Sequence, residues 1–298
     1  MNDWKSRLAE KRVLLADGAW GTELARHGLE AGVAPESWNL ENPGAVRAVA
    51  AAYVEAGAEI VLTNTFGGSP AKLDKAGLRE KAAEINRIGA ALSKEAATGK
   101  AFVFASVGPT GEMLEPLGEA TEAEMTAWFA EQIGALAEGG ADAIVVETMS
   151  DLAESLCALR AARDVCALPV ATTMTFSKGP RGYATMMGVR PEQAAAALAD
   201  AGADIVGANC GGGIEDAVEL ARLMRPATET PLWLKPNAGL PQLVNGKTVY
   251  KETPDDMAAR IPDLIEAGAE IVGGCCGTGP DHIRRFAAEL KRYHGESE

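Results

Sequence analysis

A short phrase recurs four times along the chain, and it most constrains what this sequence can fold into. The copies are AGAEIV at 56–61, GGADAIV at 139–145, AGADIV at 201–206 and AGAEIV at 267–272. The residues before two of them, 191–200 and 255–266, carry helical periodicity, and glycine suits the left-handed turn after a helix. The β-branched run that follows is typical of a strand buried on both faces. Each copy therefore predicts a helix end followed by a buried strand.

Four more short apolar runs lie between these copies, at 13–16, 101–107, 169–175 and 231–234. Eight strands result, separated by helix-like segments, and this alternation predicts a parallel sheet with right-handed crossovers. No linker-like block divides the eight units. The pattern therefore favours a single (β/α)8 TIM barrel, one domain over residues 1–298, rather than an open doubly wound sheet.

Charge and cysteine usage limit the partners and the compartment. The formal net charge of −14 argues against a nucleic-acid or anionic-membrane partner, because lysine and arginine clusters recognise those surfaces. We find no signal peptide and no membrane-length apolar run, which predicts a cytoplasmic protein. Five cysteines, two of them adjacent, do not suit a disulfide framework, so reduced thiols are available as ligands or nucleophiles.

Three of the cysteines follow predicted strands, where barrel enzymes place their chemistry. Cys210 ends the sixth strand, and Cys275 with Cys276 ends the eighth, so all three lie on one rim. One Zn²⁺ ion could bind all three and keep a fourth position open, as in catalytic zinc sites. Buried apolar cysteines are the alternative, because adjacent cysteines lack the usual two-residue spacing of zinc motifs.

The remaining cysteines and the histidines fit ordinary structural positions. Cys157 and Cys166 fall on or just after a predicted helix, and the three histidines fall away from strand ends, where we expect surface residues. A zinc ion on three thiolates keeps a bound thiol electron-rich, which favours alkyl transfer to sulfur, whereas hydrolytic zinc usually has histidine ligands. The cysteine set thus predicts a transferase acting on a thiol.

Motifs along nearly the whole chain support this interpretation: DGAWGTEL at 17–24, NTF at 64–66, GPTG at 108–111, ETM at 147–149, NCG at 209–211 and GGCCGT at 273–278. Together they resemble the homocysteine-binding methyltransferases. The resemblance implies a (β/α)8 barrel with zinc on Cys210, Cys275 and Cys276. It also implies that homocysteine thiolate attacks an electrophilic methyl group and leaves as methionine.

The resemblance further implies residues that bind the amino-acid end of homocysteine. Asp17, Gly18 and nearby backbone amides would hold that end, and Glu147 would bind the ammonium group. A turn or helix cap is the alternative for Asp17, and an ion pair with Arg181 is the alternative for Glu147. Further candidates for substrate or ligand contacts stand at other strand ends: Asn64, Thr110, Thr175, Asn209 and Asn237.

The sequence constrains the methyl donor and the oligomeric state less directly than the zinc site. The segment GPTGEML at 108–114 resembles the cobalamin-dependent branch, and the chain ends soon after the barrel. We therefore expect a methyl-corrinoid on a separate protein, with S-methylmethionine or betaine as alternative donors. Trp20 stands where the family has a smaller or more flexible residue. The long C-terminal arm of the betaine branch is missing, which suggests a monomer or small homo-oligomer.

Two other functions remain open from sequence. Lys235 ends the seventh strand and could act as a Schiff-base nucleophile in a barrel lyase or aldolase. The thiol cluster could instead serve a non-enzymatic zinc or thiol sensor. The glycine-rich loops at the sixth and eighth strands could cradle a phosphate, although the cysteines in them make this less suitable.

Overall fold

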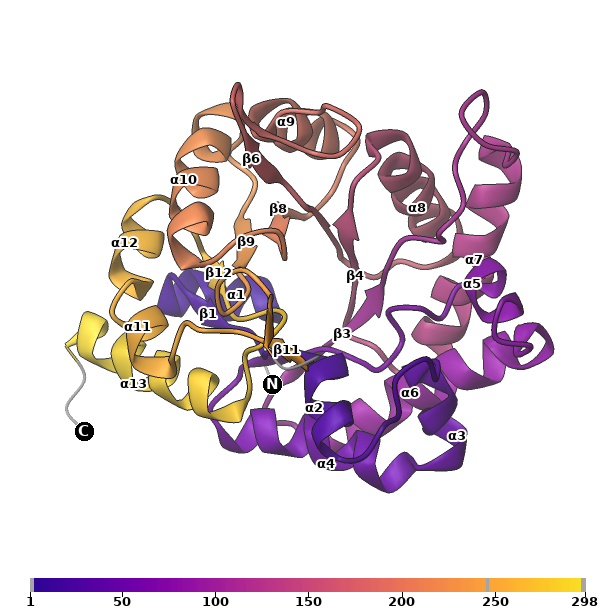
Figure 1. Cartoon of the computed structure of the whole chain (residues 1–298), viewed down its shortest axis with the longest axis horizontal. Helices are drawn as coiled ribbons and strands as arrows, with labels where there is room; N and C mark the ends of the chain where they lie inside the picture. Colours follow the sequence, from indigo (N-terminus) through magenta and orange to yellow (C-terminus); the bar gives the residue numbers. More distant parts are fainter. Residues whose placement is uncertain (1–2, 245–246, 296–298) are drawn as a thin grey trace.

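The computed structural model describes residues 3–244 and 247–295 and contains an eight-stranded parallel sheet. Its strand order is β1-β12-β9-β8-β5-β4-β3-β2, and a bridge between Ala16 and Ile60 joins the two ends of the sheet. Figure 1 shows the resulting ring of strands with helices around it. The predicted (β/α)8 barrel is confirmed.

The barrel strands lie close to the predicted runs. They are β1 (Leu14–Leu15), β2 (Ile60–Val61), β3 (Phe102–Val107), β4 (Ala143–Met149), β5 (Val170–Met174), β8 (Ile205–Asn209), β9 (Leu232–Lys235) and β12 (Ile271–Val272). The longer outer helices are α4 (Pro43–Glu55), α6 (Ala82–Ala97), α7 (Glu122–Glu138), α8 (Leu152–Val165), α9 (Pro191–Asp200), α10 (Ile214–Met224) and α13 (Pro280–His294).

Shorter helices fill the connections. They are α1 (Trp4–Lys11), α2 (Trp20–Arg26), α3 (Trp38–Glu41), α5 (Pro70–Asp74), α11 (Pro254–Ala258) and α12 (Ile261–Glu266), with 3₁₀ turns η1 (Pro35–Ser37), η2 (Arg79–Lys81) and η3 (Arg225–Ala227). No helix within the described ranges is long and apolar enough to cross a membrane.

The repeated phrase marks the same turn at each of its four positions. Its glycines Gly57, Gly140, Gly202 and Gly268 have φ angles of +103°, +90°, +93° and +107°. Side chains rarely adopt such angles, so glycine allows the chain to leave each helix and enter the next strand at once. The prediction of a helix end followed by a strand is confirmed for all four copies.

One predicted helix is divided in two. Residues 255–266 carry a single helical pattern, but the structure has α11 ending at Ala258 and α12 starting at Ile261. Pro262 lies in the first turn of α12, where its missing N–H costs nothing. Within a continuous helix, the ring of Pro262 would clash with the carbonyl four residues earlier. The prediction of one helix was therefore wrong at this proline.

Large aromatic side chains fill the barrel at the N-terminal end of the strands. Trp4 of α1 packs edge-on against Phe104 with ring centroids 6.3 Å apart, and Phe104 stacks on Trp233 at 5.6 Å. All three are buried. This packing closes one end of the barrel, so polar chemistry is confined to the other end.

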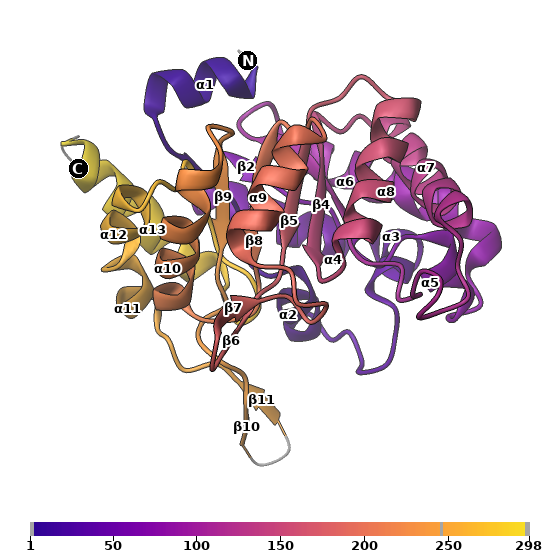
Figure 2. The ribbon, with the colours of Figure 1, turned by 90° about the horizontal axis from the view of Figure 1, so that it is seen from above.

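Two small hairpins that we did not predict project near that other end. They are β6 (Ser177–Gly179) with β7 (Gly182–Ala184), and β10 (Gln242–Val244) with β11 (Lys247–Val249). Figure 2 shows both on the side opposite α1. Their strands are three residues long, and most of their described residues are exposed. The sequence therefore has no buried apolar run that would predict these hairpins.

Candidate functional site

Three cysteine thiols converge at the C-terminal ends of the strands. Cys210 follows β8, and Cys275 and Cys276 lie in the loop after β12, with all three Sγ atoms within 4.8 Å of one another. The Sγ atoms of Cys210 and Cys276 are 3.8 Å apart. Zinc–sulfur bonds of about 2.3 Å in a tetrahedral arrangement place sulfur atoms about 3.8 Å apart. The thiol geometry therefore fits one zinc ion.

Backbone contacts with the end of β9 bring the two loops together. The N–H of Cys210 donates to the carbonyl of Lys235 at 3.0 Å, and the N–H of Cys275 donates to the carbonyl of Pro236 at 2.7 Å. Cys210 has a φ of +60°, which is uncommon for a residue with a side chain. Such strained residues cluster at ligand sites, where the surrounding structure holds them in place.

Without a cation, the three thiols hold their protons at neutral pH. The hydrogen bond with Cys275 raises the pKa of Cys210 to about 12, and the hydrogen bond with Cys210 raises that of Cys276 to about 11. For Cys275, the hydrogen bond with Cys210 lowers the pKa, but the contact with Cys276 and burial outweigh it, giving about 12. A divalent cation must therefore displace these protons as it binds.

Asn209 connects the thiols to the neighbouring strand ends. Its Oδ1 accepts from the N–H of Thr148 at 2.7 Å and from Thr173 Oγ1 at 2.6 Å. Its Nδ2 donates to Thr148 Oγ1 at 2.7 Å, to Glu147 Oε2 at 3.3 Å and to Cys275 Sγ at 3.8 Å. One side chain thus fixes the relative positions of a thiol and a carboxylate.

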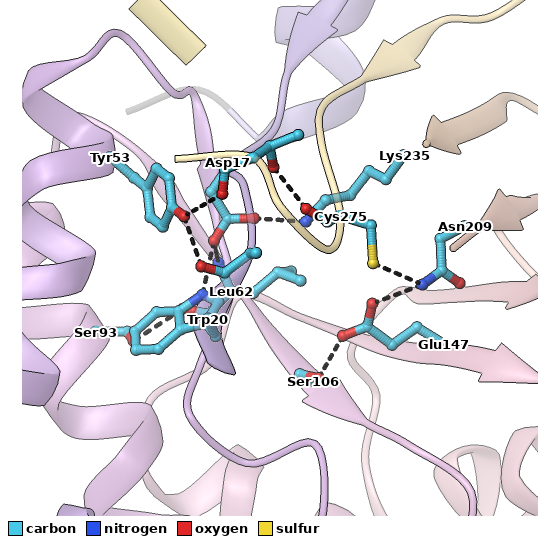
Figure 3. Close-up of polar contacts among 12 residues, drawn as sticks. Asp17, Trp20, Tyr53, Leu62, Ser93, Ser106, Glu147, Asn209, Lys235 and Cys275 are labelled. Carbon is cyan, nitrogen blue, oxygen red and sulfur yellow. Dashed lines mark hydrogen bonds and ion pairs between the residues drawn. The ribbon is translucent and has the colours of Figure 1, made fainter. Parts of the chain in front are cut away.

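Glu147 lies on β4 and faces the same part of the barrel. Its other oxygen, Oε1, accepts from Ser106 Oγ on β3, and the side chain is 8% exposed. Burial raises the pKa of Glu147, while the Lys235 ammonium lowers it. Arg181 is exposed and forms no ion pair with Glu147, so the alternative pairing is wrong. Figure 3 shows the contacts of Glu147 with Ser106 and Asn209.

Asp17 is fully buried at the end of β1 and accepts three hydrogen bonds from the chain itself. Its Oδ1 accepts from Lys235 Nζ at 2.6 Å. Its Oδ2 accepts from the N–H of Leu62 at 2.7 Å and from Trp20 Nε1 at 2.9 Å (Figure 3). Ala19 is the N-cap of α2 and no side chain caps that helix, so the cap alternative for Asp17 is wrong.

Comparison with known proteins decides the family. A family model described as homocysteine S-methyltransferase matches residues 14–290. This chain belongs to the homocysteine S-methyltransferase family. It is therefore a methyltransferase, and the hypothesis of a non-enzymatic sensor loses its support.

Curated relatives and solved structures agree with this family. The chain is 32% identical to methionine synthase of Mycobacterium leprae over 302 residues, covering 95% of this chain and 24% of that protein. The corresponding values for methionine synthase of Mycobacterium tuberculosis are 32% over 306 residues, 94% and 25%. The chain thus spans about a quarter of the length of these relatives.

The homocysteine methyltransferase MmuM from Escherichia coli has the same fold. Its metallated form superimposes with a TM-score of 0.81 at 23% identity, covering 96% of this chain and 99% of that one. Its oxidised form gives 0.80, also at 23% identity, with 97% and 99% covered. One domain over 1–298, a cytoplasmic location and a monomer or small homo-oligomer stay predictions.

The remaining predicted substrate-binding residues differ in whether their polar groups already have hydrogen-bond partners within the protein. Asn64 Nδ2 donates to the carbonyl of Pro35 at 2.7 Å and to Asn39 Oδ1 at 2.9 Å. The N–H and Oγ1 of Thr110 both donate to Glu154 Oε1 at 2.8 Å. These two side chains therefore have partners within the protein, which anchor the loops after β2 and β3.

Asn237 and Gly18 have a different character. Asn237 Nδ2 donates to the carbonyl of Gly211 at 3.4 Å, but its Oδ1 is buried without a partner in the described part of the chain. A Cβ on Gly18 would lie 2.9 Å from Thr278 Oγ1 and from Tyr53, so no side chain fits there. Asn237 thus keeps an acceptor available, and Gly18 allows close packing at the turn. Their roles toward substrate stay predictions.

Lys235 does not have the properties of a Schiff-base nucleophile. Burial by itself lowers the pKa of Lys235, but the carboxylates of Asp17 and Glu147 outweigh it and hold the pKa above its ordinary value. A lysine nucleophile must be neutral to attack a carbonyl group. The ion pair with Asp17 therefore disfavours the lyase or aldolase alternative.

One histidine was placed wrongly. His27 and His294 are exposed as predicted, but His282 is only 9% exposed. Its Nδ1 accepts from the N–H of Gly279 at 3.2 Å, which leaves Nε2–H to donate to the carbonyl of Glu252 at 3.3 Å. The carbonyl of Glu252 lies in a loop distant in sequence from His282, so no sequence pattern predicts this contact.

Sequence reasoning also missed Ser106, Thr148 and the hydrogen bond that Trp20 donates to Asp17. Ser106 interrupts the apolar run of β3, and a polar residue inside a buried strand could have marked a site contact. The φ of +62° at Thr148 has no such signal in the sequence.

Proposed function

We propose that this chain binds zinc through Cys210, Cys275 and Cys276 and transfers a methyl group to the thiol of homocysteine, giving methionine. The observation that carries the proposal is the convergence of three thiols within 4.8 Å at the mouth of a homocysteine S-methyltransferase barrel. Such a zinc ion would supply a soft Lewis-acidic position that keeps a substrate sulfur deprotonated at neutral pH.

The residues around the thiols would orient both the ligands and the amino acid. Asn209 holds Cys275 through its amide N–H, as partners of metal ligands commonly do. Glu147 is held by Ser106 and Asn209 and would bind the substrate ammonium, because a buried carboxylate is stabilised by a cation. These contacts would place the homocysteine sulfur toward the thiol cluster.

For the methyl donor, we propose a methyl-corrinoid carried by a protein outside this barrel. The support is the GPTGEML segment at 108–114, which resembles the cobalamin-dependent branch. S-Methylmethionine and betaine are the alternatives that an experiment must separate.

The deciding experiment measures methionine formed by the zinc-loaded protein from homocysteine with methylcobalamin, S-methylmethionine or betaine in parallel. Methionine from methylcobalamin would support the corrinoid donor. Methionine from one of the other donors alone would contradict the corrinoid donor while supporting homocysteine as acceptor. No methionine from any donor, with one zinc bound per chain, would contradict the proposed acceptor.

Replacing Glu147 tests its proposed role. Glu147→Gln should weaken homocysteine binding by about 10- to 100-fold, because a charge-assisted hydrogen bond to ammonium is lost. Zinc content should stay at one per chain. The control is Glu36→Gln, which neutralises another buried carboxylate whose partner is the N–H of Gly67. Unchanged homocysteine affinity in Glu147→Gln would contradict the ammonium role.

A further inference from the structure

Lys235 is the only buried lysine or arginine among residues 3–244 and 248–295, the positions whose side-chain burial the structure describes. Its side chain is 2% exposed and extends from the end of β9 to Asp17, which follows β1. Figure 3 shows this lysine in the same part of the barrel as Glu147 and Cys275. A buried ion pair adds little net stability compared with apolar packing, so its presence at this position calls for a functional reason.

The two partners differ in how many of their polar positions are occupied. Both Asp17 oxygens are engaged by three donors of the chain, from Lys235, Leu62 and Trp20. The Lys235 ammonium has three N–H donors, and its contact with Asp17 is its one hydrogen bond within the described residues. The group with remaining hydrogen-bonding capacity is therefore the ammonium rather than the carboxylate.

The charges in the mouth are complementary to an amino acid. Two buried carboxyl groups, those of Asp17 and Glu147, and one buried amino group, that of Lys235, lie at the ends of β1, β4 and β9, and Lys235 pairs with Asp17. An amino-acid substrate brings one ammonium and one carboxylate into this buried region. Glu147 suits the ammonium, and the substrate carboxylate then needs a cationic partner, since an unpaired buried charge is costly.

We propose that Lys235 binds the carboxylate of the thiol amino acid and that Asp17 is a positioning residue that holds the Lys235 ammonium in place. Trp20 and the N–H of Leu62 in turn hold Asp17. This inference rests on the proposed function and deepens it by defining the substrate class as amino acids with a carboxylate, an ammonium and a terminal thiol. It moves the main contact with the amino-acid end from Asp17 to Lys235.

Three small-molecule thiol ligands distinguish the contributions of the substrate's carboxylate and ammonium groups to binding. Homocysteine has both ends, 4-sulfanylbutanoate lacks the ammonium, and 3-aminopropane-1-thiol lacks the carboxylate. Binding of each to the zinc-loaded protein is measured by titration calorimetry, with zinc content determined in parallel. The wild-type protein should bind homocysteine at least about tenfold more tightly than 3-aminopropane-1-thiol, because one charge-assisted contact is absent. Equal affinities for these two thiols would overturn the proposal without any variant.

The decisive variant is Lys235→Met, which keeps an unbranched side chain of similar shape and removes the charge. It should weaken binding of homocysteine and 4-sulfanylbutanoate by about 10- to 100-fold and leave 3-aminopropane-1-thiol within about twofold. An equal loss of affinity for all three thiol ligands would show that Lys235 has a merely structural role and would overturn the proposal. Glu147→Gln is the matched control, and it should give the mirror pattern, with 4-sulfanylbutanoate unaffected.

Lys235→Met leaves Asp17 buried without its cation and can impair folding. The double variant Asp17→Asn with Lys235→Met removes both charges and should give the same selective pattern. A zinc-loaded wild-type protein that binds none of the three thiols would contradict the proposed function and this inference with it. Binding of all three thiols without preference for the carboxylate would contradict this inference alone.

Discussion

The side-chain amide of Asn209 donates to the Sγ atom of Cys275 at 3.8 Å, although the two residues are 66 positions apart in the sequence. Asn209 is the last residue of β8 and directly precedes Cys210. Its backbone and side chain therefore position two different thiols, one through the chain and one through a hydrogen bond. This arrangement makes the cluster depend on a residue that is not itself a thiol.

Asn209→Ala should lower zinc affinity by about 10- to 100-fold, the usual effect of removing a partner of a metal ligand. Zinc affinity is measured by competition with a chelator of known affinity. The control is Asn42→Ala at the start of α4, where the asparagine side chain caps nothing. If Asn209→Ala and Asn42→Ala bind zinc as tightly as the wild type, the amide contact does not orient the thiols.

Cys210→Ala should lose zinc and methyl transfer together, with a loss of affinity beyond that of Asn209→Ala, because a ligand itself is removed. Cys166→Ala is the matched control. The Cys166 thiol contacts the carbonyl of Ala162 at 3.4 Å at the end of α8, away from the cluster. Metal analysis and methionine formation are measured on both variants. Activity in a zinc-free Cys210→Ala protein would exclude the proposed ligand set.

Zinc affinity should rise with pH between about pH 6 and pH 8. The pKa values of Cys210 and Cys275 are raised to about 12, and that of Cys276 to about 11, so the metal-free thiols are protonated in this range. Each proton displaced by zinc makes the apparent affinity about tenfold higher per pH unit. Chelator competition at several pH values, corrected for protonation of the chelator, measures this slope. An affinity independent of pH would argue against thiolate ligands.

Two glycine substitutions should change stability in opposite directions. Gly202 has a φ of +93° and Gly134 lies inside α7, and a Cβ at either position meets no atom within 4 Å. Gly202→Ala should cost about 1–2 kcal/mol of unfolding free energy through backbone strain alone. Gly134→Ala should stabilise α7 by about 0.5–1 kcal/mol. Urea denaturation measures both, and a stabilised Gly202→Ala would disprove the strain argument.

Local patterns were sufficient to predict the architecture. The four glycine turns and the eight apolar runs are short-range features, because a positive φ and a buried strand each depend on a few adjacent residues. The parallel alternation then leaves few topologies. The local rule failed at Pro262, where a helical pattern continued past a residue that interrupts the helix.

The candidate site was only partly predictable. The rim positions of Cys210, Cys275 and Glu147 follow from the ends of their strands, since those ends meet at one face of a barrel. The partners of these residues do not follow, because Ser106, Asn209 and Lys235 act across strands that are distant in sequence. The periodicity of the sequence does not show which side chains of different strands face each other.

By itself, then, the sequence determined the barrel, the family and the three thiols, because each is encoded in local composition or in contiguous motifs. The tertiary structure alone decided that the carboxylate of Asp17 accepts hydrogen bonds from Trp20, Leu62 and Lys235. It also decided that His282 is buried against a distant carbonyl. The physical reason is that a buried charge or polar group is stabilised by whichever partners the folded chain brings within about 3 Å, and those partners are set by packing between strands.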